Sequence, residues 1–114
     1  MKYILVMLFF AFGIVYGAAY TTEEASGHIG ENATVCGIVS SGYYARSSRG
    51  KPTFINLDGR YPNQAFTVVI WGDHRSKFGQ PERKYTGKRI CVTGVIDMYR
   101  GIPQIIVNQP AQIQ

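Results

Sequence analysis

The sequence predicts an all-β domain, a five-stranded barrel in Greek-key order with a short N-terminal helix, that follows a cleaved signal peptide. Three observations lead to this fold class. The chain opens on an apolar run without charges, and five later segments are rich in β-branched and aromatic residues. Clusters of glycine, proline and polar residues separate those segments, as turns do between short strands.

Residues 1–19 have the order of residues found in a secretory signal peptide. Lys2 is the only early charge, residues 4–16 carry no charged or amide side chain, and small residues end the segment. The apolar run is shorter than the roughly twenty residues that a membrane-spanning helix needs. We therefore expect cleavage after Ala19, with no membrane span afterwards. The mature domain, residues 20–114, is then secreted or periplasmic.

The charge balance of the mature chain is basic. Removing Lys2 from the twelve basic residues leaves eleven against seven acidic ones, a net charge of +4. Such an excess suits a polyanionic partner such as nucleic acid, and it equally suits a soluble basic domain without one.

Two cysteines remain in the mature chain, and outside the cytoplasm such a pair is usually oxidised. We expect a disulfide between Cys36 and Cys91, the alternative being two free buried thiols. The cysteines and the two histidines, His28 and His74, lack the close spacing of metal ligands. The sequence therefore predicts neither a metal site nor a cofactor.

The mature chain begins with a segment, residues 20–32, that predicts a short helix and a turn. Thr21 and Glu24 match a capping box, and glycines follow. This helix is expected to close one end of the barrel. The strands are expected at residues 33–40, 52–58, 65–71, 89–97 and 103–108.

Two of the connections between these strands are long. Residues 41–51 form a basic, flexible loop rich in tyrosine and arginine. Residues 72–87 lose the strand pattern, and Gly79 and Pro81 would interrupt a long helix, so we expect a loop with at most a short helical turn.

Five strands, a longer connection between the third and fourth, and glycine within the first and fourth strands form the pattern of an OB-fold barrel. The order VCGIVS, KPTFINLDG, FTVVIW and GKRICVTGVI resembles the anticodon-binding type of OB domain. More narrowly, TFINL, YPNQAFTVVIW, GKRICVTG and YRGIPQI are similar to small exported bacterial proteins described as OB-fold nucleic-acid-binding domains. The resemblance covers residues 33–107 and implies the fold more strongly than a function.

Alternation along the second and third strands indicates which face could bind a ligand. Ile55 and Leu57 belong inside the barrel, so Phe54 points outward. In the domains that the chain resembles, the matching phenylalanine stacks on a base. By the same alternation Phe66, Val68 and Ile70 are expected inside, and Thr67, Val69 and Trp71 outside. The candidate nucleic-acid-binding residues combine this strand face with the basic and aromatic loops: Tyr43, Tyr44, Arg46, Arg49, Lys51, Phe54, Asn56, Thr67, Trp71, Tyr99 and Arg100.

Structural roles stay open for some of these side chains. Phe54 and Trp71 would also fit under a loop, and Tyr99 with Arg100 would also fit a hairpin turn. The acidic residues are scattered and no nucleophile lies beside a base, so we expect no catalytic site and no enzyme.

The predicted function is therefore that of an exported, non-enzymatic domain that binds single-stranded DNA or RNA, or a similar polyanion. Two alternatives remain. One is a periplasmic stress or interaction module for a protein, an oligosaccharide or a small ligand. The other is an accessory domain that acts with a secreted nuclease.

Overall fold

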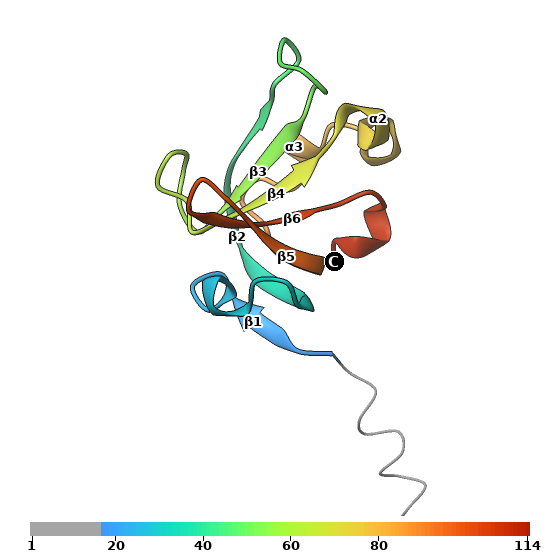
Figure 1. Ribbon diagram of the computed structural model, residues 1–114. Coiled ribbons are helices and arrows are strands. Elements are labelled where there is room, and N and C mark those ends of the chain that lie inside the picture. The colour runs from blue at the N-terminus through green and yellow to red at the C-terminus, as the bar shows by residue number, and fades with distance from the viewer. Residues whose placement is uncertain (1–16) are drawn as a thin grey trace, which may run out of the picture.

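The computed structural model describes residues 17–114, so nearly all of the predicted signal peptide lies outside the described part (Figure 1). Five strands close into a mixed barrel in which β2 pairs with both β3 and β5. Within the barrel, all pairs are antiparallel except β4 with β6, which is parallel. The barrel strands are β2 (Asn32–Tyr44), β3 (Thr53–Leu57), β4 (Phe66–Ile70), β5 (Arg89–Tyr99) and β6 (Ile102–Ile106). This order, β2-β3-β4-β6-β5, is compatible with an OB-like fold.

The five predicted strands are confirmed, with one substantial difference in length. Strand β2 continues to Tyr44 instead of ending at residue 40. Its first half pairs with β5 and its second half with β3, and the register shifts between Val39 and Ser41. Two residues before this shift, Gly37 leaves room for Asp58, whose carboxylate would lie 2.8 Å from an added Cβ. That carboxylate accepts hydrogen bonds from Thr22 Oγ1 at 2.6 Å and from the backbone N–H of Ile38 at 2.9 Å.

The predicted alternation places the core correctly. Ile55, Leu57, Phe66, Val68 and Ile70 are fully buried. The partners of these side chains come from the remaining strands and from the segments after them: Val35, Val39, Val92, Ile96, Ile105 and Val107. These strands therefore fill the barrel mainly with branched aliphatic side chains, together with Phe66.

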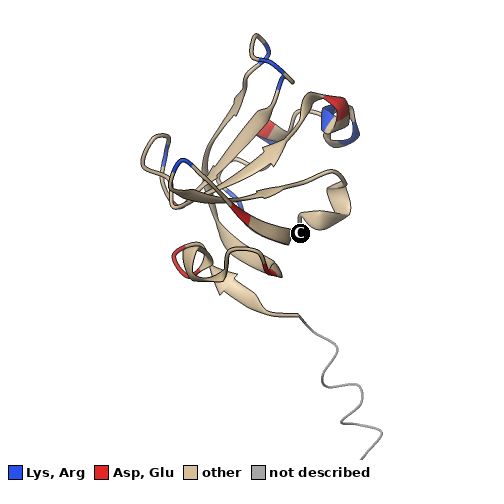
Figure 2. Ribbon diagram, in the orientation of Figure 1, with Lys and Arg blue, Asp and Glu red and all other residues tan. Residues whose placement is uncertain are grey.

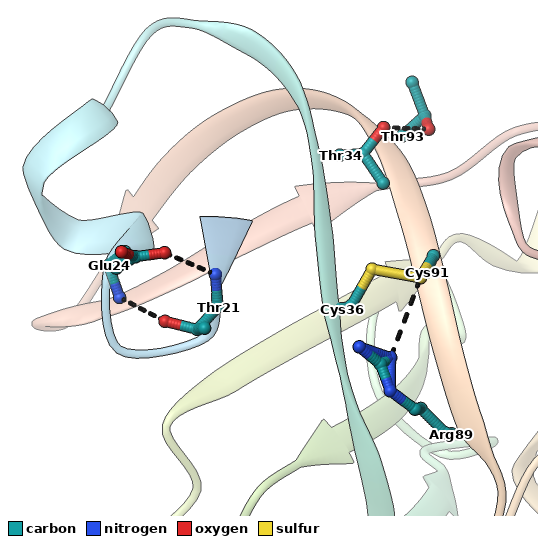
Figure 3. The surroundings of a disulfide bond; sticks show 7 residues. All are labelled: Thr21, Glu24, Thr34, Cys36, Arg89, Cys91 and Thr93. Atoms are coloured by element: carbon teal, nitrogen blue, oxygen red, sulfur yellow. Dashed lines mark hydrogen bonds between the residues drawn. A yellow bond between two sulfur atoms is a disulfide. The ribbon is translucent and has the colours of Figure 1, made fainter. Parts of the chain in front are cut away.

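The predicted N-terminal helix is wrong. Residues 20–32 contain the end of an extra strand, β1 (Ala19–Thr21), which runs parallel to β2, and a single 3-10 turn, η1 (Ala25–His28). The reciprocal hydrogen bonds of the capping box are present: Thr21 Oγ1 accepts from the Glu24 N–H at 3.2 Å, and the Thr21 N–H donates to Glu24 Oε1 at 2.8 Å (Figure 3). Because β1 takes the first residues and glycines follow, the segment between is too short for an α-helix, whose first turn is costly to form.

The α-helices lie instead in the middle of the chain, between β4 and β5 (Figure 1). They are the single turns α2 (Gly72–Arg75) and α3 (Pro81–Lys84), with the 3-10 turn η2 (Ser76–Phe78) between them. Phe78 anchors this segment in the core at 2% exposure. A last 3-10 turn, η3 (Pro110–Gln112), precedes the C-terminal residues. Within residues 17–114 no helix has the length and hydropathy to cross a membrane.

A disulfide joins Cys36 on β2 to Cys91 on β5, as the sequence predicted (Figure 3). The two residues are directly opposite each other in the β2–β5 ladder, with their Cα atoms 4.0 Å apart. Thr34 and Thr93, the pair two positions along, share a hydrogen bond of 2.7 Å between their hydroxyls. A structural disulfide is characteristic of an oxidising compartment and so points to a location outside the cytoplasm.

Candidate functional site

A row of polar side chains crosses the outer face of the barrel from strand to strand. Ser41 on β2 is paired with Asn56 on β3, and Asn56 is paired with Thr67 on β4. Thr67 is paired with Gln104 on β6, and Gln104 with Asp97 on β5. Side chains at paired positions lie on the same face of a sheet, so these five residues form one continuous polar row.

A second row beside it is aromatic and aliphatic. Tyr43 is paired with Phe54, Phe54 with Val69, and Val69 with Ile106. Val69 lies on this outward face as predicted, yet it is only 3% exposed. Tyr43 at the end of the row is 62% exposed, so its ring is available to a ligand.

Loops rise at the side of these rows and turn the strand face into a groove of about 830 Å³. The loop between β3 and β4 contributes Arg60, Tyr61 and Gln64, and the end of β5 with the turn after it contributes Tyr99 and Arg100. Figure 2 shows basic residues on both of these connections and at the tip of the β2–β3 loop. The full lining is Ser41, Gly42, Tyr43, Ala45, Ser48, Phe54, Asn56, Arg60, Tyr61, Pro62, Gln64, Thr67, Tyr99, Arg100, Ile102 and Gln104.

The floor of the groove is uncharged and almost completely buried. Asn56 is 3% exposed, Thr67 is 7% exposed and Gln64 is 8% exposed. The Asn56 amide donates to Ser41 Oγ at 3.1 Å, and the Gln64 amide donates to Thr67 Oγ1 at 3.0 Å. Among the described residues, nothing donates a hydrogen bond to the carbonyl oxygens of these two amides.

The walls supply aromatic rings and positive charge. Tyr61 and Tyr99 are 76% and 57% exposed, respectively, and stand with Tyr43 and Phe54 around the same floor. Arg60 and Arg100 are both exposed, and the Arg100 guanidinium lies 5.2 Å from the centroid of the Tyr99 ring. The groove therefore offers flat surfaces for stacking and two cations beside them.

Six of the eleven predicted binding residues line this groove. They are Tyr43, Phe54, Asn56, Thr67, Tyr99 and Arg100. Arg46, Arg49 and Lys51 are exposed in the loop between β2 and β3 but are not part of the lining.

The structure gives Tyr44 and Trp71 other surroundings. The Arg75 guanidinium lies 3.7 Å from the centroid of the Tyr44 ring and is held there by two hydrogen bonds to Glu82, of 2.8 and 2.7 Å. Trp71 packs against Gly50, where an added Cβ would lie 2.8 Å from the indole. Neither aromatic ring lines the groove, although the sequence analysis placed both among the candidate binding residues.

Sequence reasoning missed part of the groove. Arg60 and Tyr61 lie between the expected strands at residues 52–58 and 65–71 and were not among the candidate binding residues, although an aromatic residue beside an arginine was the same signal that selected Tyr99 and Arg100. Gln64 and Gln104 carried no comparable signal, because an isolated glutamine in a loop or strand is common.

The histidines of the described chain lie away from the groove. His28 stacks on Tyr20, with the ring centroids 3.8 Å apart, and its Nδ1 is 2.6 Å from Glu31 Oε2. His74 Nδ1 is 3.1 Å from the Lys77 ammonium. In residues 17–114, no three His, Cys, Asp or Glu side chains gather in a way that could hold a metal ion.

Comparison of the sequence with protein-family models and with curated proteins finds no match. The function of the groove is therefore inferred from its own residues.

Proposed function

We propose that the chain is an exported, non-enzymatic domain that binds single-stranded DNA or RNA, or a similar polyanion, in the groove. The observation that carries this proposal is the meeting of four aromatic rings and two arginines around one strand face. The rings are those of Tyr43, Phe54, Tyr61 and Tyr99.

Each part of the groove has a place in this function. Stacking of a base on an aromatic ring contributes about 1–3 kcal/mol and is independent of sequence, because every base has a π-face. Arginine pairs with phosphate through a planar fork of donors, and Arg60 and Arg100 line the same groove as the rings. Splayed, unstacked bases fit such a groove, whereas a duplex keeps its bases stacked inside.

Export is supported by two features. The disulfide between Cys36 and Cys91 suits an oxidising compartment, and residues 1–19 have the order of a signal peptide. The nucleic acid would then be met outside the cytoplasm, either in the periplasm or after secretion.

The test is the binding of labelled DNA and RNA oligonucleotides to the protein, followed by fluorescence anisotropy at several salt concentrations. If Arg60 and Arg100 neutralise two phosphates, the slope of log K against log salt concentration should be about −1.4. If Arg46, Arg49 and Lys51 neutralise three more, the slope should steepen to about −3.5. Tyr99→Ala should weaken binding about 5- to 150-fold, the equivalent of losing one stacked base.

Matched variants separate a groove effect from a general one. Trp71→Ala removes an aromatic ring that is 41% exposed outside the groove lining, and Arg83→Ala removes an exposed cation on α3. Both should bind oligonucleotide as the unmodified protein does. Absence of DNA and RNA binding at low salt would refute the proposal, and so would equal losses in Tyr99→Ala and Trp71→Ala.

An oligosaccharide is the second candidate ligand, and the uncharged floor of amides and hydroxyls favours it. Sugars also stack on aromatic rings, and OB-folds bind both classes of ligand on this face. Binding of a neutral oligosaccharide that does not respond to salt, in protein that ignores oligonucleotides, would support this candidate over the first.

A further inference from the structure

The buried amides of Asn56 and Gln64 each have a carbonyl oxygen that accepts no hydrogen bond from any described residue. Buried polar atoms are nearly always paired in native proteins, and leaving one unpaired costs about 1–3 kcal/mol. Both residues line the groove, on the face that would meet a ligand. Two unpaired acceptors in one binding floor therefore point to donors supplied by the ligand.

The other end of each amide is hydrogen-bonded within the barrel. Asn56 donates to the Ser41 hydroxyl and Gln64 donates to the Thr67 hydroxyl, and in this arrangement each carbonyl oxygen is the end without a partner among the described residues. The wall side chains of Tyr43, Tyr61 and Tyr99 are more than half exposed. Exposed side chains change rotamer within nanoseconds, so they can turn to admit the edge of a planar group to the floor.

We propose that these two amides select bases that carry an exocyclic amino group. This inference rests on the proposed function. The amino group of cytosine, adenine or guanine donates to a floor oxygen, whereas uracil and thymine place a carbonyl oxygen at the position where cytosine has its amino group. The carbonyl oxygen of the base would then face a carbonyl oxygen of the floor, and no hydrogen bond could form between them. The aromatic walls set the affinity for any single strand, and the amide floor sets the preference among bases.

Cytosine against uracil is the sharpest comparison, because the two bases have the same ring size and stack similarly. With full-length protein at one salt concentration, we expect an oligomer of deoxycytidine to bind about tenfold more tightly than one of deoxyuridine, within the range for one well-made base contact. The double variant Asn56→Leu/Gln64→Met should reduce this ratio to near one. Tyr99→Ala should weaken both oligomers by the same factor and leave the ratio unchanged.

The variant keeps side chains of similar size, but it also removes the hydrogen bonds that the two amides donate to Ser41 and Thr67, and leaving a buried hydroxyl unpaired costs about 1–3 kcal/mol. A measurement on the unmodified protein makes the test independent of the variant. In NMR titrations, the side-chain amide signals of Asn56 and Gln64 should shift with deoxycytidine oligomer and shift much less with deoxyuridine oligomer. Equal affinity for the two oligomers would overturn base selection and leave nucleic-acid binding standing, whereas absence of binding to either would overturn both.

Discussion

Removing the disulfide tests the part of the fold that closes the barrel. Cys36 and Cys91 are 55 residues apart in sequence and directly opposite in the β2–β5 ladder. In the chain-entropy model, a cross-link that closes a loop of this length stabilises the native state by about 4 kcal/mol, because it restricts the unfolded chain. A domain of this size has a total stability of about 5–15 kcal/mol. The double variant Cys36→Ser/Cys91→Ser should therefore lose a large share of it.

The assay is equilibrium unfolding in urea, followed by circular dichroism, for the oxidised protein and the double variant. The variant should unfold at lower urea, with a steeper dependence on denaturant because its unfolded chain exposes more surface. A control in the same ladder, Thr34→Ala/Thr93→Ala, removes the neighbouring cross-strand hydrogen bond and should cost only about 1 kcal/mol.

Two results would contradict this reasoning. One is a double variant whose stability lies within about 1 kcal/mol of the oxidised protein, since that is the scale of the threonine control. The other is the detection of two free thiols in the unfolded, unmodified protein.

Three further changes test the packing and the surface charges. Phe66→Ala empties a fully buried site and should cost about 3–5 kcal/mol in calorimetry, and a smaller loss would contradict its central position. Gly42→Ala places a methyl group against the backbone of Glu82 and should cost about 1–3 kcal/mol in urea unfolding, and an unchanged stability would contradict this close contact. The hydrogen bond from Tyr20 lowers the pKa of Glu31 below 4.5 and raises the pKa of Tyr20 above 10.0. This hydrogen bond therefore stabilises the folded protein between pH 4.5 and pH 10.0. Glu31→Gln should therefore melt slightly earlier at neutral pH and match the unmodified protein in acid, below the lowered pKa of Glu31; a constant difference would contradict this.

The strands could be predicted because inward-facing and outward-facing residue types alternate within each short segment. Ile55 and Leu57 had to lie inside once the second strand was recognised, and burial confirms both. The length of β2 could not be predicted in this way. Residues 41–44 contain serine, glycine and two tyrosines, a composition that also suits a loop, and they become a strand because β3 provides hydrogen-bond partners for them. The helix predicted for the N-terminal segment was wrong for a related reason, because the pairing of β1 with β2 overrides a weak helix signal.

The candidate site was less predictable than the fold. Phe54 and Asn56 follow from the alternation, but the floor also needs Gln64, which reaches Thr67 from the loop between β3 and β4. A loop conformation of this kind is set by packing, and local sequence does not specify it. The same limit applies to Trp71, which was placed on the binding face by alternation and lies instead against Gly50.

The two tyrosines at the end of β2 show how the barrel separates support from binding. They are adjacent, so their side chains point to opposite faces of the strand. On one face Arg75 covers the Tyr44 ring and pairs with Glu82, while the backbone of Glu82 packs against Gly42. The mid-chain helical segment thus holds this half of β2 from behind, and the 62% exposed ring of Tyr43 projects from a supported strand. A ring carried by a rigid strand loses little conformational freedom when a base stacks on it. Because Arg75 covers the Tyr44 ring and Tyr43 lines the groove, Tyr43, and not its neighbour, belongs to the proposed binding surface.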